Sequence, residues 1–263
     1  MDLWHAVLLG ITQGLTEFLP ISSSGHLVLL QKFINVPDRI AVSFDIVIHL
    51  GTLVAVVIYF YDDLKLLVQG VLKREADSLR LAWYLILGTL PAVAAGFLLR
   101  DYFEGLFGSG IATAWQLIAN GIMLLVADRL TGERRIENLN SGDALLVGVG
   151  QAVAIIPGIS RSGATMAAGL FRKLSRQAAA RYSFLLSIPV ILGAGLLDAK
   201  NLFGEGYRLI GPGAFWVGMA SSALSGYLVI KAFLSYLQRG TFKFFGYYCL
   251  VIGGIALALF ARG

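Results

Sequence analysis

Apolar stretches of about 20 residues recur along this chain, and that length crosses the roughly 30 Å hydrocarbon core of a bilayer. Six stretches are expected to span a membrane as helices: residues 40–60, 81–99, 111–130, 178–199, 213–233 and 244–261. Of the 263 residues, 57% are hydrophobic and only 14% are charged, against roughly 25% charged in a soluble domain. The sequence predicts an all-α, polytopic membrane protein with a single domain, 1–263.

Two further apolar stretches, residues 3–34 and 144–171, are each interrupted halfway by a polar cluster rich in Pro, Gly and Ser. The first cluster runs from Pro20 to His26 and the second from Pro157 to Thr165. Non-helical backbone persists at membrane depth only where it is buried in protein or lines a wet cavity. Both stretches are therefore predicted to be re-entrant helical hairpins whose turns point inward.

An internal repeat relates the two hairpins. Shifting the sequence by 138 positions gives identities at five of the 14 residues that begin at Gln13, and each copy is followed by three predicted spans. Three is an odd number, so the second copy must enter the membrane from the opposite side. Repeat one covers about 1–130 and repeat two about 144–261, in an inverted-topology arrangement that places a site near the midplane where the halves meet.

Loop charges support this topology. The formal net charge is +5, but the Lys and Arg residues are scattered among short loops and form no long basic face, which argues against nucleic acid as a partner. Thirteen of them fall on the side that the predicted topology makes cytoplasmic and six on the other. Both termini are then expected outside the cytoplasm.

Glu17, His26 and Arg161 are ionisable residues that lie close to the turns of the predicted hairpins. A lone charge at the bilayer centre costs at least about 2.5 kcal/mol, so a function must compensate for it. Arg161 lies in a turn of glycines and hydroxyl side chains, and its guanidinium suits phosphate oxygens. This turn is predicted to bind a diphosphate, with glycines that admit close approach of the backbone and hydroxyls that donate: Gly158, Ser160, Ser162, Gly163 and Thr165.

The first hairpin offers complementary chemistry. Gln13 and Glu17 share one helical face, aimed at the turn that holds His26. Glu17 either binds a divalent cation that bridges it to the substrate, orients His26 or water, or forms a structural ion pair with Arg161. His26 is close enough in sequence to Ser23 for a base and nucleophile pair, and water is the alternative nucleophile.

The remaining polar groups of the first turn, Ser22, Ser24 and Gly25, are assigned to substrate binding, with helix capping as the alternative for the two serines. Asp45 and His49, in the first predicted span, are interpreted as a pair within the helix bundle, with a place on the pocket wall as the alternative, and are given no catalytic role.

The two clusters resemble the signatures of the undecaprenyl pyrophosphate phosphatases of the BacA type. The first signature is matched by Gln13-x-x-x-Glu17 followed by Pro20-x-Ser22-Ser23-Ser24-Gly25-His26, and the second by the residues from Pro157 to Thr165. Where some members carry two glutamates, this chain has Gln13 and Glu17. The preference for Ser23 among the three serines rests partly on this resemblance.

The resemblance implies hydrolysis of a C55 polyprenyl pyrophosphate lipid to its monophosphate, which recycles the carrier for peptidoglycan synthesis and confers bacitracin resistance. It also implies a divalent cation, Mg2+ or Ca2+, held by Glu17, a homodimer, and a place in the plasma (inner) membrane. Glu17, Ser23, His26 and Arg161 become the expected catalytic residues. The rival function is a polyprenyl-phosphate flippase or transporter, or an enzyme that does both, because inverted repeats with broken helices also serve alternating access.

Overall fold

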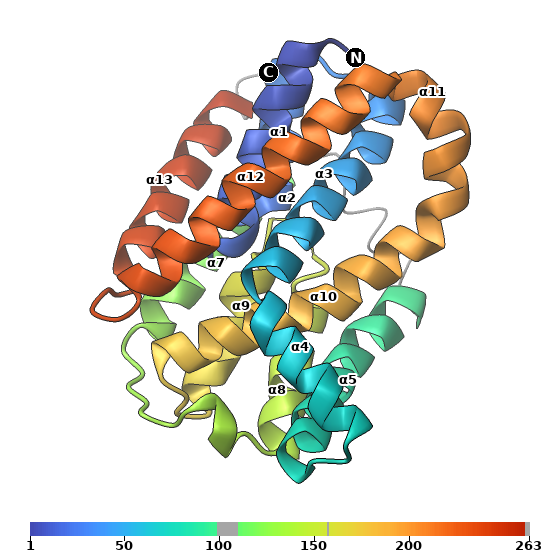
Figure 1. Cartoon of the computed structure of the whole chain (residues 1–263). Coiled ribbons are helices and arrows are strands. Elements are labelled where there is room, and N and C mark those ends of the chain that lie inside the picture. Colours follow the sequence, from blue (N-terminus) through green and yellow to red (C-terminus); the bar gives the residue numbers. More distant parts are fainter. Residues whose placement is uncertain (99–109, 157, 261–263) are drawn as a thin grey trace.

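Six long apolar helices account for most of the fold in the computed structural model, which describes residues 1–98, 110–156 and 158–260 (Figure 1). Among those residues, six helices have the length and composition to cross a membrane. They are α3 (Asp38–Tyr59), α5 (Ala76–Leu98), α7 (Gly110–Ala127), α10 (Arg176–Asn201), α12 (Pro212–Tyr236) and α13 (Lys243–Phe260). The six predicted spans are confirmed; the predicted ends at residues 99 and 261 lie outside the described residues. The chain is a multi-pass helical membrane protein.

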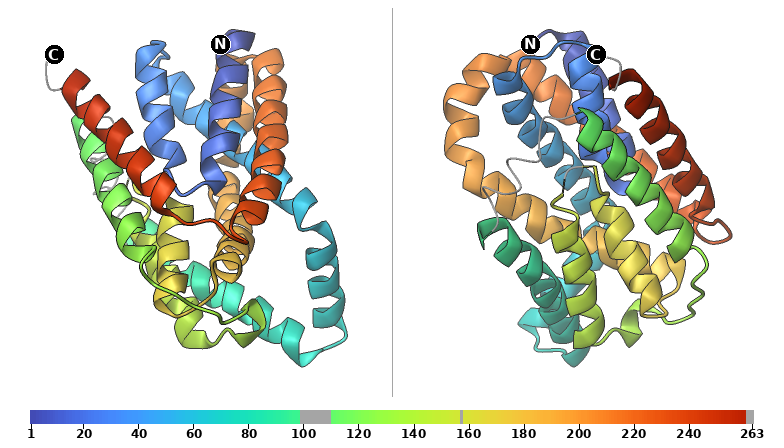
Figure 2. Two further views of the ribbon diagram at one scale, coloured as in Figure 1. Left: turned by 90° about the vertical axis from the view of Figure 1, so that its left-hand side faces the viewer. Right: turned by 180° about the vertical axis from the view of Figure 1, so that it is seen from behind.

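Both interrupted stretches form helical hairpins. The first consists of α1 (Leu3–Phe18) and α2 (Ser23–Phe33), and the second of α8 (Ser141–Val153) and α9 (Arg161–Phe171). The first hairpin enters from the end of the molecule that holds both termini, the second enters from the opposite end, and their turns approach each other midway (Figures 1 and 2). This arrangement fits the predicted inversion, while the depth of the hairpins in a bilayer stays a prediction.

The two halves of the chain are interlocked. Helix α1 packs along α12 from the second half, and α8 packs along α5 from the first half. Glycines permit this close approach: a Cβ on Gly14 would lie 2.0 Å from Ser225 Oγ, and a Cβ on Gly148 would lie 2.5 Å from the Gly88 carbonyl oxygen. Each hairpin is thus anchored on a span of the other half, and the halves cannot separate without losing both contacts.

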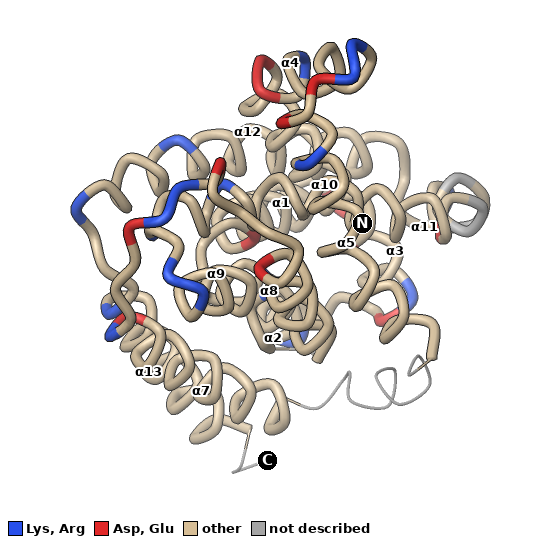
Figure 3. The backbone as a smooth tube through the Cα atoms, turned by 90° about the horizontal axis from the view of Figure 1, so that it is seen from below, with Lys and Arg blue, Asp and Glu red and all other residues tan. Residues whose placement is uncertain are grey.

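Short elements connect the spans at the two ends. They are α4 (Tyr61–Leu72), the 3-10 helix η1 (Ile136–Asn138), the π-helix η2 (Leu202–Gly206) and α11 (Tyr207–Ile210). Seen from the end opposite the termini, Lys and Arg residues cluster in the connections of this face (Figure 3). This is the face that the charge bias assigns to the cytoplasm.

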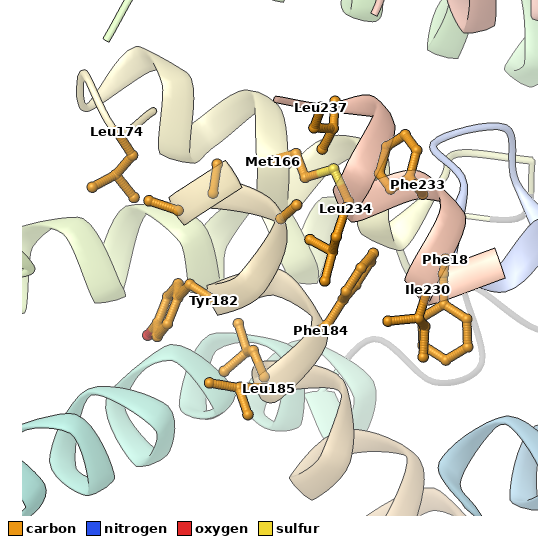
Figure 4. Packing of buried hydrophobic residues seen from close by; sticks show 14 of the residues in the cluster. Phe18, Met166, Leu174, Tyr182, Phe184, Leu185, Ile230, Phe233, Leu234 and Leu237 are labelled. Atoms are coloured by element: carbon orange, nitrogen blue, oxygen red, sulfur yellow. The ribbon is translucent and has the colours of Figure 1, made fainter. Parts of the chain in front are cut away.

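An aromatic cluster fixes the first hairpin against α10. Phe18, at the end of α1, meets Phe184 of α10 edge to face, with ring centroids 5.2 Å apart. Phe233 of α12 packs against Phe184 at 6.2 Å (Figure 4). Because Phe18 directly follows Glu17, this packing sets the position of that carboxylate.

A buried carboxylate anchors the second hairpin at the charged face. Asp143, which is fully buried, accepts hydrogen bonds from Arg134 Nη2 at 2.7 Å and Arg172 Nε at 2.6 Å. It also accepts from the backbone N-H of Asn140, completing the capping box of α8. Burial alone would raise the pKa of Asp143, but the hydrogen bonds from Arg134 and Arg172 hold it below its ordinary value.

We expect Asp143→Asn to lower the unfolding midpoint at neutral pH by an amount equivalent to about 2 kcal/mol, because both half-exposed arginines lose their countercharge. A lowered carboxyl pKa stabilises the fold at pH above the unfolded-state value of about 4, and the gain is lost as pH falls through the folded-state pKa. The difference in thermal midpoint between wild type and variant should therefore shrink below about pH 4. A difference that is constant from pH 7 to pH 3 would contradict this account.

Candidate active site

Three predicted site residues meet where the two hairpin turns approach each other. Arg161 Nη2 lies 2.6 Å from Glu17 Oε1, and Ser23 Oγ donates to Glu17 Oε2 at 2.7 Å. Glu17 and Arg161 are 144 residues apart in sequence, and their side chains are only 6% and 15% exposed. The ion pair left open as an alternative for Glu17 is thus present, and it joins the two halves of the chain.

The ends of the hairpin helices place these groups. Glu17 is in the last turn of α1, Ser23 begins α2 and Arg161 begins α9. The preceding residues, Ser22 and Ser160, are the N-caps, and their hydroxyls accept from the backbone N-H groups of Gly25 and Gly163. The capping alternative therefore holds for Ser22, and Ser160 has the same role in the second hairpin.

Further hydrogen bonds orient the guanidinium of Arg161. Its Nη1 donates to the Ser183 carbonyl oxygen of α10 at 3.0 Å. Thr165, one turn after Arg161 on α9, donates to the Arg161 carbonyl oxygen at 2.8 Å, and its hydroxyl lies 2.7 Å from Ser183 Oγ. Thr165 is fully buried, so in this structure it holds α9 against α10.

Two other predicted ligands connect the turns to each other. Ser162 Oγ donates to the Leu19 carbonyl oxygen at 2.9 Å, and Ser24 Oγ accepts from the backbone N-H of Gly158 at 3.4 Å. Sequence analysis assigned these serines to the substrate. In the structure their hydroxyls link one hairpin to the other.

His26 lies away from the Glu17 cluster. Its Nδ1 is 2.7 Å from the Ser22 carbonyl oxygen, and its Nε2 is 2.9 Å from the Tyr248 hydroxyl of α13, with the two rings stacked. A carbonyl oxygen only accepts, so Nδ1 carries a proton and Nε2 is free to accept from Tyr248. The structure does not bring the His26 imidazole to Ser23, whose hydroxyl contacts Glu17 instead.

A cavity of about 460 Å³ opens beside the cluster. Glu17, Ser23 and Arg161 contribute polar groups to its wall, and apolar side chains of α2, α3 and α10, such as Leu27, Leu50 and Val190, contribute most of the remainder. A charged head group and the start of an apolar chain could therefore be bound side by side.

Asp45 and His49 also line this cavity, so the alternative to a pair within the bundle holds. His49 Nε2 lies 3.7 Å from Glu17 Oε2, and the Asp45 carboxylate accepts from the Gln31 amide at 2.6 Å. Their side chains do not pair with each other, since His49 Nδ1 contacts the Asp45 carbonyl oxygen. The spacing of four residues placed them on one face of a helix, but the sequence did not show that this face meets the hairpins.

The donor set suits a cation shared with a substrate. No group of three His, Cys, Asp or Glu residues in the described parts of the chain could hold a metal ion by itself. Gln13 donates its amide N-H to Glu17 Oε2 at 3.1 Å, while its buried Oε1 has no partner. An unpartnered oxygen beside a carboxylate fits Mg2+ or Ca2+, which take oxygen ligands and, for Mg2+ above all, substrate phosphates.

Comparison with known proteins identifies the family. Residues 6–255 match the family model described as bacitracin resistance protein BacA. An undecaprenyl-diphosphatase of Moorella thermoacetica is 42% identical over 262 residues, covering 99% of this chain and 98% of that protein. Another, from Geobacter sulfurreducens, is 43% identical over 270 residues and covers both chains completely. This chain belongs to the BacA family.

Proposed function

We propose that this chain hydrolyses undecaprenyl diphosphate to undecaprenyl phosphate and inorganic phosphate. The single observation that carries the proposal is a serine hydroxyl bonded to a carboxylate that is itself paired with a buried arginine, all on the wall of one cavity. The relatives carry the name of this activity. A lipid diphosphate needs a polar pocket for its head group and an enzyme embedded in lipid for its tail, and this chain offers both.

Substrate binding is expected to rearrange the ion pair. In the free protein Arg161 compensates the charge of Glu17, and a diphosphate would compete for the same guanidinium. Arg161 keeps its bond to the Ser183 carbonyl oxygen and so stays oriented. Glu17 Oε2 already accepts the Ser23 hydroxyl hydrogen bond, so it is placed to take the proton that Ser23 must lose.

In the proposed reaction, Ser23 Oγ attacks the terminal phosphorus while its proton passes to Glu17 Oε2. The bond from phosphorus to the bridging oxygen breaks, its electrons stay on the departing lipid monophosphate, and Arg161 stabilises the charge that develops. Water then cleaves the serine phosphate and releases inorganic phosphate. Attack by water activated at Glu17 gives the same products and is the alternative. His26, whose Nδ1 contacts the Ser22 carbonyl oxygen, remains a proposed catalytic residue.

Glu17, which lines the cavity, would hold a divalent cation together with the substrate, and the buried Gln13 amide that donates to Glu17 Oε2 would orient this carboxylate. When bound, such an ion neutralises phosphate charge. We further propose a homodimer in the plasma (inner) membrane, with phosphate released on the outer side. A flippase activity of the same chain would be measured separately, by a sidedness assay that follows the movement of the lipid between the two leaflets of sealed vesicles.

The proposal is tested by phosphate release from a polyprenyl diphosphate, with magnesium or calcium present, by the purified protein in detergent. Ser23→Ala and Arg161→Ala are each expected to lower the rate about 100-fold or more, because one removes the nucleophile and the other the charge that stabilises the transition state. Ser221→Ala and Arg181→Ala, outside the cavity, are matched controls that should stay active. Wild-type rates in both Ser23→Ala and Arg161→Ala would show that these residues do not form the active site.

A second comparison identifies the group that accepts the proton from Ser23. Glu17→Gln keeps an oxygen near Ser23 and Arg161 but removes the base, so we expect a loss of about 1,000-fold in kcat. His26→Gln should cost only about tenfold, because its imidazole faces Tyr248. The reverse order of the two losses would make His26 the base and require its side chain to turn toward Ser23.

A further inference from the structure

Asn120 bonds to the backbone of both hairpin turns at once. Asn120 lies on α7, which belongs to neither hairpin. The Asn120 side chain is 1% exposed. Its Nδ2 donates to the Pro20 carbonyl oxygen at 2.9 Å, and its Oδ1 accepts from the backbone N-H of Ser160 at 3.1 Å. A single side-chain amide therefore satisfies a buried acceptor of one turn and a buried donor of the other.

The same face of α7 packs against a glycine in each turn. A Cβ on Gly25 would lie 3.2 Å from a methyl carbon of Leu117, and a Cβ on Gly158, where φ is +84°, would lie 2.6 Å from Gln116 Cβ. The space above both glycines is thus occupied by α7. Gly158 is predicted from the sequence to let the backbone approach a ligand, whereas in the structure this space is filled by a helix.

The two contacts of Asn120 adjoin the reactive groups. Pro20 lies midway between Glu17 and Ser23, and Ser160 directly precedes Arg161. No described residue of α7 lines the cavity, so Asn120 would not touch a head group bound there. We propose that Asn120 is a positioning residue: it fixes the distance between the half of the site that carries Glu17 and Ser23 and the half that carries Arg161.

A merely structural role predicts a different result. A buried hydrogen bond contributes to stability wherever it lies, so its loss lowers the unfolding midpoint and leaves the folded enzyme unchanged. Ser222 of α12 is the matched control for that case. It is fully buried and donates to the Ile48 carbonyl oxygen of α3 at 2.6 Å, so this bond joins α12 to α3 and neither turn.

This inference rests on the proposed function, and its test uses the same phosphate-release assay. Asn120→Ala removes both bonds to the turns, together with the bond from Nδ2 to Cys249 Sγ at 3.4 Å, and Asn120→Leu removes them while filling a similar volume, which keeps α7 packed. Both are assayed well below their own unfolding midpoints. A displacement of reacting groups by about 1 Å costs on the order of 100-fold, so we expect kcat to fall 10- to 100-fold with KM within about threefold of wild type.

Ser222→Ala should lower the unfolding midpoint while its kcat stays within about twofold of wild type. The inference is overturned if Asn120→Leu keeps wild-type kcat, or if Ser222→Ala loses kcat to the same degree. A wild type that releases no phosphate would instead overturn the proposed function, and this inference with it.

Discussion

The ion pair between Glu17 and Arg161 is the interaction on which the rest of the site depends. Each charge alone would be costly in an apolar interior, and each is nearly buried here. Because one residue comes from the first hairpin and the other from the second, the pair can form only when both halves of the chain are in place. In the proposed reaction the same two charges serve as the base and as the fixed cation that phosphoryl transfer requires.

The fold supports this pair from several directions. The crossed packing of α1 on α12 and of α8 on α5 anchors each hairpin to the opposite half. Phe18, the residue next to Glu17, packs against Phe184 of α10. The Ser183 carbonyl oxygen of the same helix orients Arg161. Many of the serines and glycines of the turns serve the turns themselves, as caps, as links between hairpins and as surfaces for α7. The cavity is left with a small set of reactive groups.

Sequence patterns were sufficient for the spans, the broken hairpins and their inversion, because these follow from apolar length, turn residues and a repeat. Pairing of Glu17 with Arg161 was also within reach as an alternative, since both are expensive in lipid. The orientation of His26 was not, because its partner Tyr248 lies 222 residues away. The place of His49 at the cavity was only an alternative, because it depends on how α3 is rotated against the hairpins. Helix caps and phosphate ligands use the same serines, and only the packed turns distinguish them.

A double-mutant cycle on unfolding, with Glu17→Gln, Arg161→Met and the double variant, measures the central interaction directly. The account predicts a coupling energy of about 2 kcal/mol, since each single change leaves a buried charge alone and the double change removes both. The exposed pair of Asp63 and Arg181 is the reference and should couple by less than about 0.5 kcal/mol. Additive losses at Glu17 and Arg161 would show that the two halves of the site are not held together by this pair, and would contradict the account.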